Sequence, residues 1–388
     1  HLGLRGVEGV HVRVKDPSGV EVLRVRNIRV RVNGIDAARS ALFGKGPITI
    51  TVPSASIADA DANLDADETG KSLRLANAFT PKPTPPEPPS PPGRGVHVEA
   101  PRFELAHGHA HGTPPNATKI DAQLDDLAAH AHITSQLVRA DLDHVTLTTK
   151  GLPRGVDPTG AVHGYFALPA PNGNGFDLHA LFDGKVGGMP TTAEAHIDDQ
   201  RIDARVDTYD RTGQSARDMV SEVQLTEPLS LHAEAHGVLS HFDTSAKVRL
   251  GGASVDAKAT IDTTDAAKTR IEGEVSARHV DLSAITTDAP ESDLGLDATG
   301  SVNLAKDGGI DGKASVDTLP GRLDRDEIPK VEIRGSFTKQ TAHVRARIYE
   351  RSMPTEVALD TAPREGIVDG RAIDASVRTK IPDIRRLP

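Results

Sequence analysis

Three histidines, His107, His109 and His111, alternate with small residues in a way that can hold a metal ion. On a β-strand such alternate side chains share a face and lie about 7 Å apart, so two neighbouring imidazoles can chelate one ion. His130 and His132 repeat the spacing and are expected on an adjacent strand. No acidic residue follows at metal-motif spacing, and solvent-facing histidines on the polar side of a strand are the simpler interpretation. We therefore assign no metal ligands and expect no cofactor.

The segment from Asp59 through Asp61 to Asn63 begins like a calcium-binding loop. The sixth position of that loop is Leu64, where the sharp turn requires glycine, and the twelfth is Gly70, where a bidentate glutamate is required. An acidic hairpin end is the alternative interpretation, and we prefer it.

Other catalytic patterns are missing from the sequence. It contains no Gly-x-Ser-x-Gly elbow, no His-Glu-x-x-His pair and no phosphate-binding glycine loop. Scattered carboxylates need a cleft before they can act as acid and base, and the composition does not indicate one. We expect no catalytic residues and no enzymatic activity.

The composition is unusual in its lack of bulky side chains. The 388 residues include no Trp, 3 Tyr, 8 Phe and 3 Met, so Ala, Val, Leu and Ile must do the apolar packing. Small apolar residues spread evenly along a chain favour thin layers over one thick core. We therefore expect an elongated all-β protein.

Net charge and cysteine content limit the partners that the chain can bind and the chemistry that it can carry out. The net charge of −10 is distributed over both signs, which argues against nucleic acid as a partner. The first forty-five residues are locally basic, which suits either an anionic bilayer surface or a solvated strand face. Cysteine is absent, which removes disulfides and thiolate chemistry.

The first residue is His and no signal peptide or apolar span is recognisable, so we expect a segment of a longer protein.

Alternation with a period of two predicts β-strands with one apolar face. The inward-facing candidates are Val10, Val12, Val14, Ile28, Val30, Val32, Ile48, Ile50, Val52, Ala246, Val248, Leu250, Val331, Ile333, Val344, Ala346 and Ile348. Charged residues or threonines occupy the positions between them. Each strand is therefore expected to have one dry face and one wet face.

Turn sequences separate these strands at hairpin spacing, as in a meander. Predicted turns include 16–19, 157–160, 172–175, 183–184, 198–199, 210–213, 251–252 and 307–309. One short helix is predicted at 36–44, with Asp36 as N-cap and Gly44 as C-cap. A weaker helical pattern covers 215–223, where a strand fits equally well.

Eight prolines between 81 and 92 exclude regular structure there, and we expect an extended surface loop or linker, with recognition by a proline-binding module as an alternative. The predicted organisation is an N-terminal β module at 1–80, a Pro-rich linker at 81–95 and a repeating β-groove at 96–388.

Residues 23–79 resemble the N-terminal module of the AsmA-like envelope proteins, and of the TamB family in particular. In that module two strands lead through a short helix into a strand, an acidic glycine turn and an asparagine-containing close. Residues 273–316, with Val280-Asp281-Leu282-Ser283 and recurrent Gly-x-Val units, are similar to the TamB repeat region.

The resemblance implies a long, curled antiparallel β-groove, called a β-taco, in the periplasm of a double-membraned bacterium. It implies phospholipids as ligands, an inner-membrane anchor N-terminal to this chain and an outer-membrane barrel-type assembly protein as partner. The residues support the ligand independently, because a one-sided apolar sheet without covering helices or aromatic residues needs another cover, and acyl chains are suited to it. The alternative is a scaffold for outer-membrane protein assembly that transfers no lipid.

Overall fold

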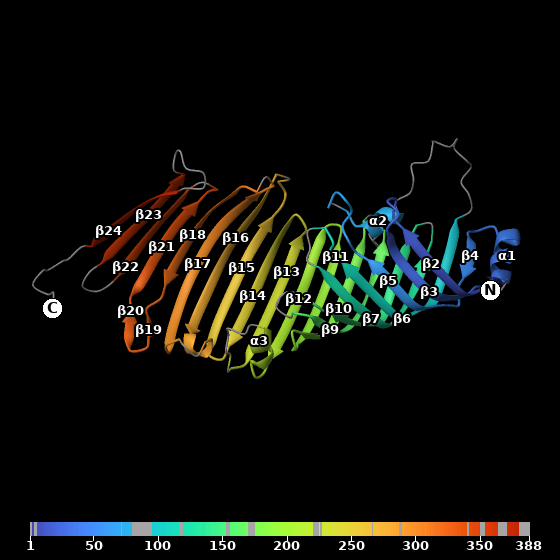
Figure 1. Cartoon of the computed structure of the whole chain (residues 1–388), viewed down its shortest axis with the longest axis horizontal. Coiled ribbons are helices and arrows are strands. Elements are labelled where there is room, and N and C mark those ends of the chain that lie inside the picture. The colour runs from blue at the N-terminus through green and yellow to red at the C-terminus, as the bar shows by residue number, and fades with distance from the viewer. Residues whose placement is uncertain are drawn as a thin grey trace, which may run out of the picture. The chain divides into compact units, whose positions relative to one another are not determined.

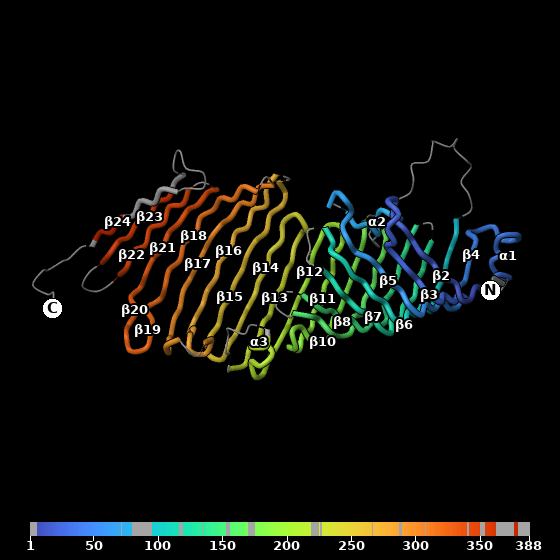
Figure 2. The backbone as a smooth tube through the Cα atoms, viewed as in Figure 1, coloured from blue at the N-terminus to red at the C-terminus, as the bar shows by residue number. Residues whose placement is uncertain are grey.

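The computed structural model describes residues 2–3, 6–70, 72–79, 95–115, 119–134, 136–152, 156–169, 175–219, 225, 227–265, 267–286, 289–306, 308–339, 341–349, 354–363 and 371–379. Strands dominate these residues, and nearly all of their pairings are antiparallel, so the predicted all-β fold class is confirmed (Figures 1 and 2). The chain divides into two compact units, His1–Asp199 and Gln200–Pro388, and each is described by itself. The predicted linker at 81–95 lies, apart from Gly95, outside the described residues.

The first unit contains two short helices, α1 (Gly34–Phe43) and α2 (Arg74–Phe79), among its strands. The strands are β1 (Leu2–Gly3), β2 (Gly6–Lys15), β3 (Glu21–Arg31), β4 (Ile48–Thr51), β5 (Ser54–Asn63), β6 (Val96–Gly112), β7 (Ile120–Ile133), β8 (Val138–Thr149), β9 (Pro158–Leu168), β10 (Asp177–Val186) and β11 (Met189–Asp198). From β6 onward, each strand pairs with the next as an antiparallel meander.

The N-terminal strands join this meander through two parallel pairings. β2 pairs with β3, and β3 with β5, both antiparallel. β5 then lies parallel to β6, and β4 lies parallel to the beginning of β6, so both share one edge of that strand. Parallel neighbours need a crossover connection, and residues 64–95 supply it. Residues on both sides of the Pro-rich segment therefore belong to one sheet.

The second unit is a longer meander in which strands lie side by side in one layer (Figure 1). Its strands are β12 (Arg201–Asp210), β13 (Leu229–Val238), β14 (His241–Leu250), β15 (Ala253–Asp262), β16 (Lys268–Val280), β17 (Ser292–Ala305), β18 (Ile310–Thr318), β19 (Gly321–Leu323), β20 (Asp326–Ile328), β21 (Lys330–Phe337), β22 (Ala342–Tyr349), β23 (Thr355–Pro363) and β24 (Arg371–Thr379). Successive strands pair antiparallel, except that β18 pairs with β21 while β19 and β20 form a small extension beside β17. One α-helix, α3 (Gln214–Met219), and a 3-10 turn, η2 (Leu282–Ala284), occur among the described residues of this unit.

The predicted first helix forms, but its cap differs from the prediction. Asn33, not Asp36, is the N-cap of α1, and its side chain accepts a hydrogen bond from the Asp36 N–H at 3.4 Å. Asparagine and aspartate cap about equally well, so the position of the preceding strand end decides between them. Gly44 is the C-cap as predicted. The weaker helical pattern is realised as α3, and α2 was not predicted.

Several predicted turns form, and two are wrong. Gly251 and Gly252 reverse the chain between β14 and β15, and the predicted turn at 16–19 is also present. Residues 158–160 instead open β9, and 183–184 lie within β10. The chain reverses four residues later at Gly187 and Gly188, whose φ values of 56° and 86° favour glycine. Of the turn predicted at 172–175, only Gly175 lies among the described residues.

The first turn is held by the buried carboxylate of Asp16. Its Oδ1 accepts hydrogen bonds from the Ser18 hydroxyl at 2.7 Å and the Val20 N–H at 2.9 Å. Its Oδ2 lies 2.8 Å from Nη1 of Arg74 at the start of α2. These donors, the Ser18 hydroxyl foremost and then Arg74, lower the pKa of Asp16 from 3.8 to about 2. The turn is thereby tied to the helix.

This carboxylate predicts an acid-dependent loss of stability. Because the folded state depresses the pKa, the contribution is present above pH 3.8 and is lost as the pH falls toward about 2. We expect Asp16→Asn to lower the urea midpoint at neutral pH and to remove this part of the pH dependence. Urea unfolding at about pH 5 and about pH 2 measures it. An unchanged difference between the wild type and Asp16→Asn across this range would contradict the assignment.

Candidate functional site

One row of apolar residues crosses the whole meander of the second unit. Residues paired directly across antiparallel strands share a face of the sheet. Following the register from β12 to β24 gives Val206, Ala233, Ala246, Ala257, Val275, Ala298, Val316, Ile333, Ala346, Val357 and Val377. No polar side chain interrupts this row. We call the face that carries it the apolar face.

A parallel row of small residues lies beside the first. It contains Ala204, Ala235, Thr244, Ala259, Gly273, Gly300, Ala314, Gly335, Val344 and Leu359. Larger side chains flank these two rows, among them Phe242, Ile261 and Ile271 on one side and Leu231 and Val248 on the other. Small residues between larger ones leave a trough, and a hollow of about 470 Å³ lies there, lined by both rows from β12 to β16.

The apolar face remains accessible to solvent along its length. Some large side chains on it are more than a third exposed, including Val275 at 38%, Ile310 at 46% and Val377 at 67%, and others such as Val248 and Ile333 are half-buried. A residue in the core of a sandwich would be nearly fully buried. The described helix of this unit, α3, contacts β12. Side chains on the face are therefore covered only in part, by adjacent side chains of the same sheet.

The opposite face of the same sheet is charged. Its corresponding row contains Asp207, His232, Lys247, Asp256, Ser276, Asp297, Asp317, Glu332, Arg347, Glu356 and Arg378. Ion pairs cross the strands, such as Arg278 with Asp297 at 2.7 Å. Hydrogen bonds from Ser276 and then Arg278 lower the pKa of Asp297. Exposed ion pairs of this kind add little stability. Their charged groups remain hydrated, so this face of the sheet is the one that contacts water.

The predicted groove residues of the second unit all lie on the apolar face. They are Ala246, Val248 and Leu250 on β14, Val331 and Ile333 on β21, and Val344, Ala346 and Ile348 on β22. The register connects them through strands for which no groove residue was predicted. Val255, Val275, Leu296 and Val316 belong to the same face, and their alternation in the sequence was the signal for them.

In the first unit, the register also places predicted residues together. Val10 pairs with Ile28, and Val30 with Val7, while bulges at Gly9 and Asn27 adjust the register between them. Val12 and Val14 pair with Val25 and Leu23 further along the same strands.

The remaining predicted residues of this unit lie at or beyond strand ends. Ile48 and Ile50 pair with Val96 and Val98 across the parallel β4–β6 contact. Val32 follows the end of β3 and Val52 follows the end of β4, where the Val52 N–H donates to the Glu99 carbonyl at 2.8 Å. The strands are thus shorter at these ends than predicted.

The histidines lie on the strands predicted for them, whereas the acidic segment at 59–63 does not form the structure predicted for it. His107, His109 and His111 share one face of β6, as predicted. Asp59 and Asp61 lie within β5, so this segment forms neither a calcium loop nor a hairpin end. His130 and His132 lie on the adjacent strand β7, but near its other end, opposite Asp141 and Arg139 of β8.

Comparisons with known proteins found no relative. No family model matches this chain, and neither a curated protein nor a solved structure matches it. The resemblance drawn from residues 23–79 and 273–316 therefore stays a prediction. Among the helices of the described residues, none has the length and apolar character needed to cross a bilayer.

Proposed function

We propose that this chain shields the acyl chains of phospholipids on the apolar face of its second unit. The observation that carries the proposal is the uninterrupted apolar row from Val206 to Val377, whose larger side chains are half-buried or, at Val275 and Val377, exposed. An exposed apolar surface of this extent marks an interaction site. In this view the protein is a non-catalytic lipid conduit.

The chemistry of the trough supports a hydrocarbon ligand. Its two central rows are built from Ala, Gly, Val, Ile and Leu, with Thr244 as the polar exception in the second row. Acyl chains need no hydrogen bonds, and their transfer from water contributes about 0.8 kcal/mol per buried CH₂. Small side chains leave the volume that such chains occupy. Zwitterionic or anionic headgroups would remain in water outside the trough.

The proposal also includes a cellular compartment, a membrane anchor and a partner protein. A conduit for phospholipids is needed where two membranes are separated by water, which suits the periplasm of a double-membraned bacterium. The full-length protein would be anchored in the inner membrane through a segment outside this chain. At the outer membrane, a barrel-type assembly protein would be its partner. The resemblance of residues 23–79 to AsmA-like proteins is what motivates these three assignments.

Lipid extraction tests the proposed activity directly. We expect phospholipid to co-purify with the chain from bacterial membranes and to be identified by mass spectrometry after extraction. A delipidated sample should take up a fluorescent phospholipid from vesicles of phosphatidylethanolamine and phosphatidylglycerol. Absence of both co-purified and reconstituted lipid would reject the conduit and favour an assembly scaffold that carries none.

A further inference from the structure

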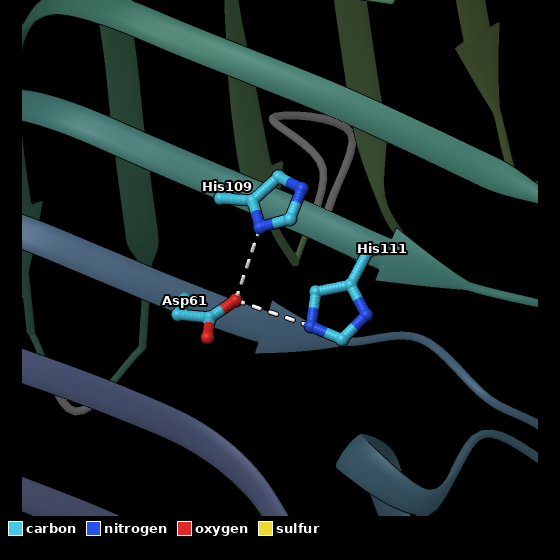
Figure 3. A group of neighbouring side chains, drawn as sticks. All are labelled: Asp61, His109 and His111. Carbon is cyan, nitrogen blue, oxygen red and sulfur yellow. Dashed lines mark ion pairs between the residues drawn. The ribbon is translucent and has the colours of Figure 1, made fainter. Parts of the chain in front are cut away.

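The parallel contact between β5 and β6 brings Asp61 together with two histidines that lie far from it in the sequence. Asp61 of β5 is the register partner of His109 on β6, and His111 follows two residues later on the same face. Figure 3 shows both imidazoles turned toward one carboxylate oxygen of Asp61. The ligand atoms of the three residues all lie within 4.8 Å of one another.

The separations match those between ligands of a tetrahedral ion. Oδ1 of Asp61 lies 3.4 Å from Nδ1 of His109 and 3.2 Å from Nε2 of His111. Zinc binds nitrogen and carboxylate oxygen at about 2.0–2.1 Å, so two ligands at a tetrahedral angle are about 3.3 Å apart. Both distances from the Asp61 oxygen are therefore those expected around one ion.

One carboxylate oxygen of Asp61 accepts no hydrogen bond from the described residues. Oδ1 of Asp61 is buried and has no hydrogen-bond partner among the described residues, although two imidazole nitrogens lie close to it. A buried acceptor of this kind is costly unless a donor or a cation meets it. Arg24, its register partner on β3, is engaged with Glu21, with 2.5 Å between Nε and Oε1.

A second carboxylate fixes which nitrogen of His109 faces Asp61. Nε2 of His109 lies 3.0 Å from Oδ1 of Asp121 on β7. An ionised carboxylate only accepts hydrogen bonds, so in the neutral ring Nε2 would carry the proton and Nδ1 would present its lone pair to the side of Asp61. Two acceptor atoms that face each other can both coordinate one metal ion. A metal-bound histidine usually donates its other ring N–H to a carboxylate, as His109 would to Asp121.

We propose that Asp61 Oδ1, His109 Nδ1 and His111 Nε2 bind one divalent transition-metal ion, with Zn²⁺ as the best match. Two imidazoles and a carboxylate suit zinc, and water would complete four-fold coordination. Asp121 is a positioning residue that orients His109. The next histidine on the face, His107, is held by Asp125 at 2.8 Å, which raises the pKa of His107.

The position of the site suggests a structural role. The ion would cross-link β5 to β6, a parallel pair that no hairpin connects, near the carboxyl end of both strands. Ligation on both strands would strengthen the attachment of β2, β3 and β5 to the meander. Zinc should therefore raise the unfolding temperature of the first unit, because only the folded chain brings the three ligands together.

Calorimetric titration of the apo-protein with Zn²⁺ tests the site, and Co²⁺ absorption reports its geometry. We expect one tight equivalent of Zn²⁺, and intense visible bands from tetrahedral Co²⁺. Asp61→Asn, His109→Gln and His111→Gln should each abolish the tight equivalent, whereas Asp121→Asn should weaken it by about 10–100-fold. Circular dichroism confirms that each variant is folded before it is titrated.

A matched control separates this site from adventitious binding by other surface histidines. His343 pairs with Asp360 at 2.6 Å on the second unit, so His343→Gln removes a histidine–carboxylate pair outside the cluster. This variant should keep the tight equivalent and the rise in unfolding temperature. Absence of a tight equivalent in the wild type, or its persistence in a His109→Gln/His111→Gln double variant, would overturn the proposal.

Discussion

Val248→Asp is expected to abolish phospholipid binding while leaving the sheet folded. Val248 lies on the apolar face, between Leu231 and Val255 in the register, and beside the row that begins at Val206. A carboxylate there would face the acyl chains without a partner, and burying an unpaired charge costs several kcal/mol. The side chain is only half-buried in the free protein, so the sheet itself has little reason to unfold.

Ser245→Asp provides the matched control on the same strand. It introduces the same charge on the charged face, where Lys258 is the register partner of Ser245 on β15. We expect this variant to bind fluorescent phospholipid as the wild type does, with the amount bound per chain as the readout. An equal loss of phospholipid binding in both variants would show that any added charge on β14 reduces binding, whichever face of the sheet carries it.

Val22→Ala is expected to lower the free energy of unfolding of the first unit by about 2 kcal/mol. Val22 is 1% exposed, and it is the one large side chain among the described residues that is buried to this degree. It lies on β3, against which α2 packs, and next to the turn that Asp16 ties to Arg74. Removing two methyl groups from a buried side chain leaves a cavity into which the surroundings relax only in part.

Val20→Ala is the corresponding control, since the same atoms are removed from a side chain that is 40% exposed. Urea unfolding followed by circular dichroism should show a change below about 0.5 kcal/mol for this variant. Similar losses in the two valine variants would mean that burial beneath α2 does not stabilise the unit.

Alternation in the sequence was sufficient to predict the faces of three strands within the second unit, β14, β21 and β22. Each hairpin there pairs neighbours in the sequence, so the register follows from the turn, and residues such as Val248 and Ala246 fall on the expected face. The error at 183–184 has a physical cause. An Asp-Gly pair favours a turn, but the two glycines that follow at 187–188 accommodate positive φ without strain.

The first unit was harder to predict because its contacts are not local. Bulges at Gly9, Asn27 and Asp126, each with positive φ, interrupt the period of two. The pairing of β5 with β6 joins segments separated by the Pro-rich stretch, and no spacing rule connects Asp61 with His109. Sequence reasoning found the histidines of the proposed zinc site and missed their carboxylate for this reason.

The meander of the second unit also has a consequence for how its length can change. From β13 to β16 each strand pairs with the strands before and after it, and every second strand runs in the same direction. Gain or loss of a two-strand hairpin therefore preserves both the direction of the flanking strands and the identity of the dry face. Such a sheet can be lengthened or shortened in steps of one hairpin without loss of its apolar face.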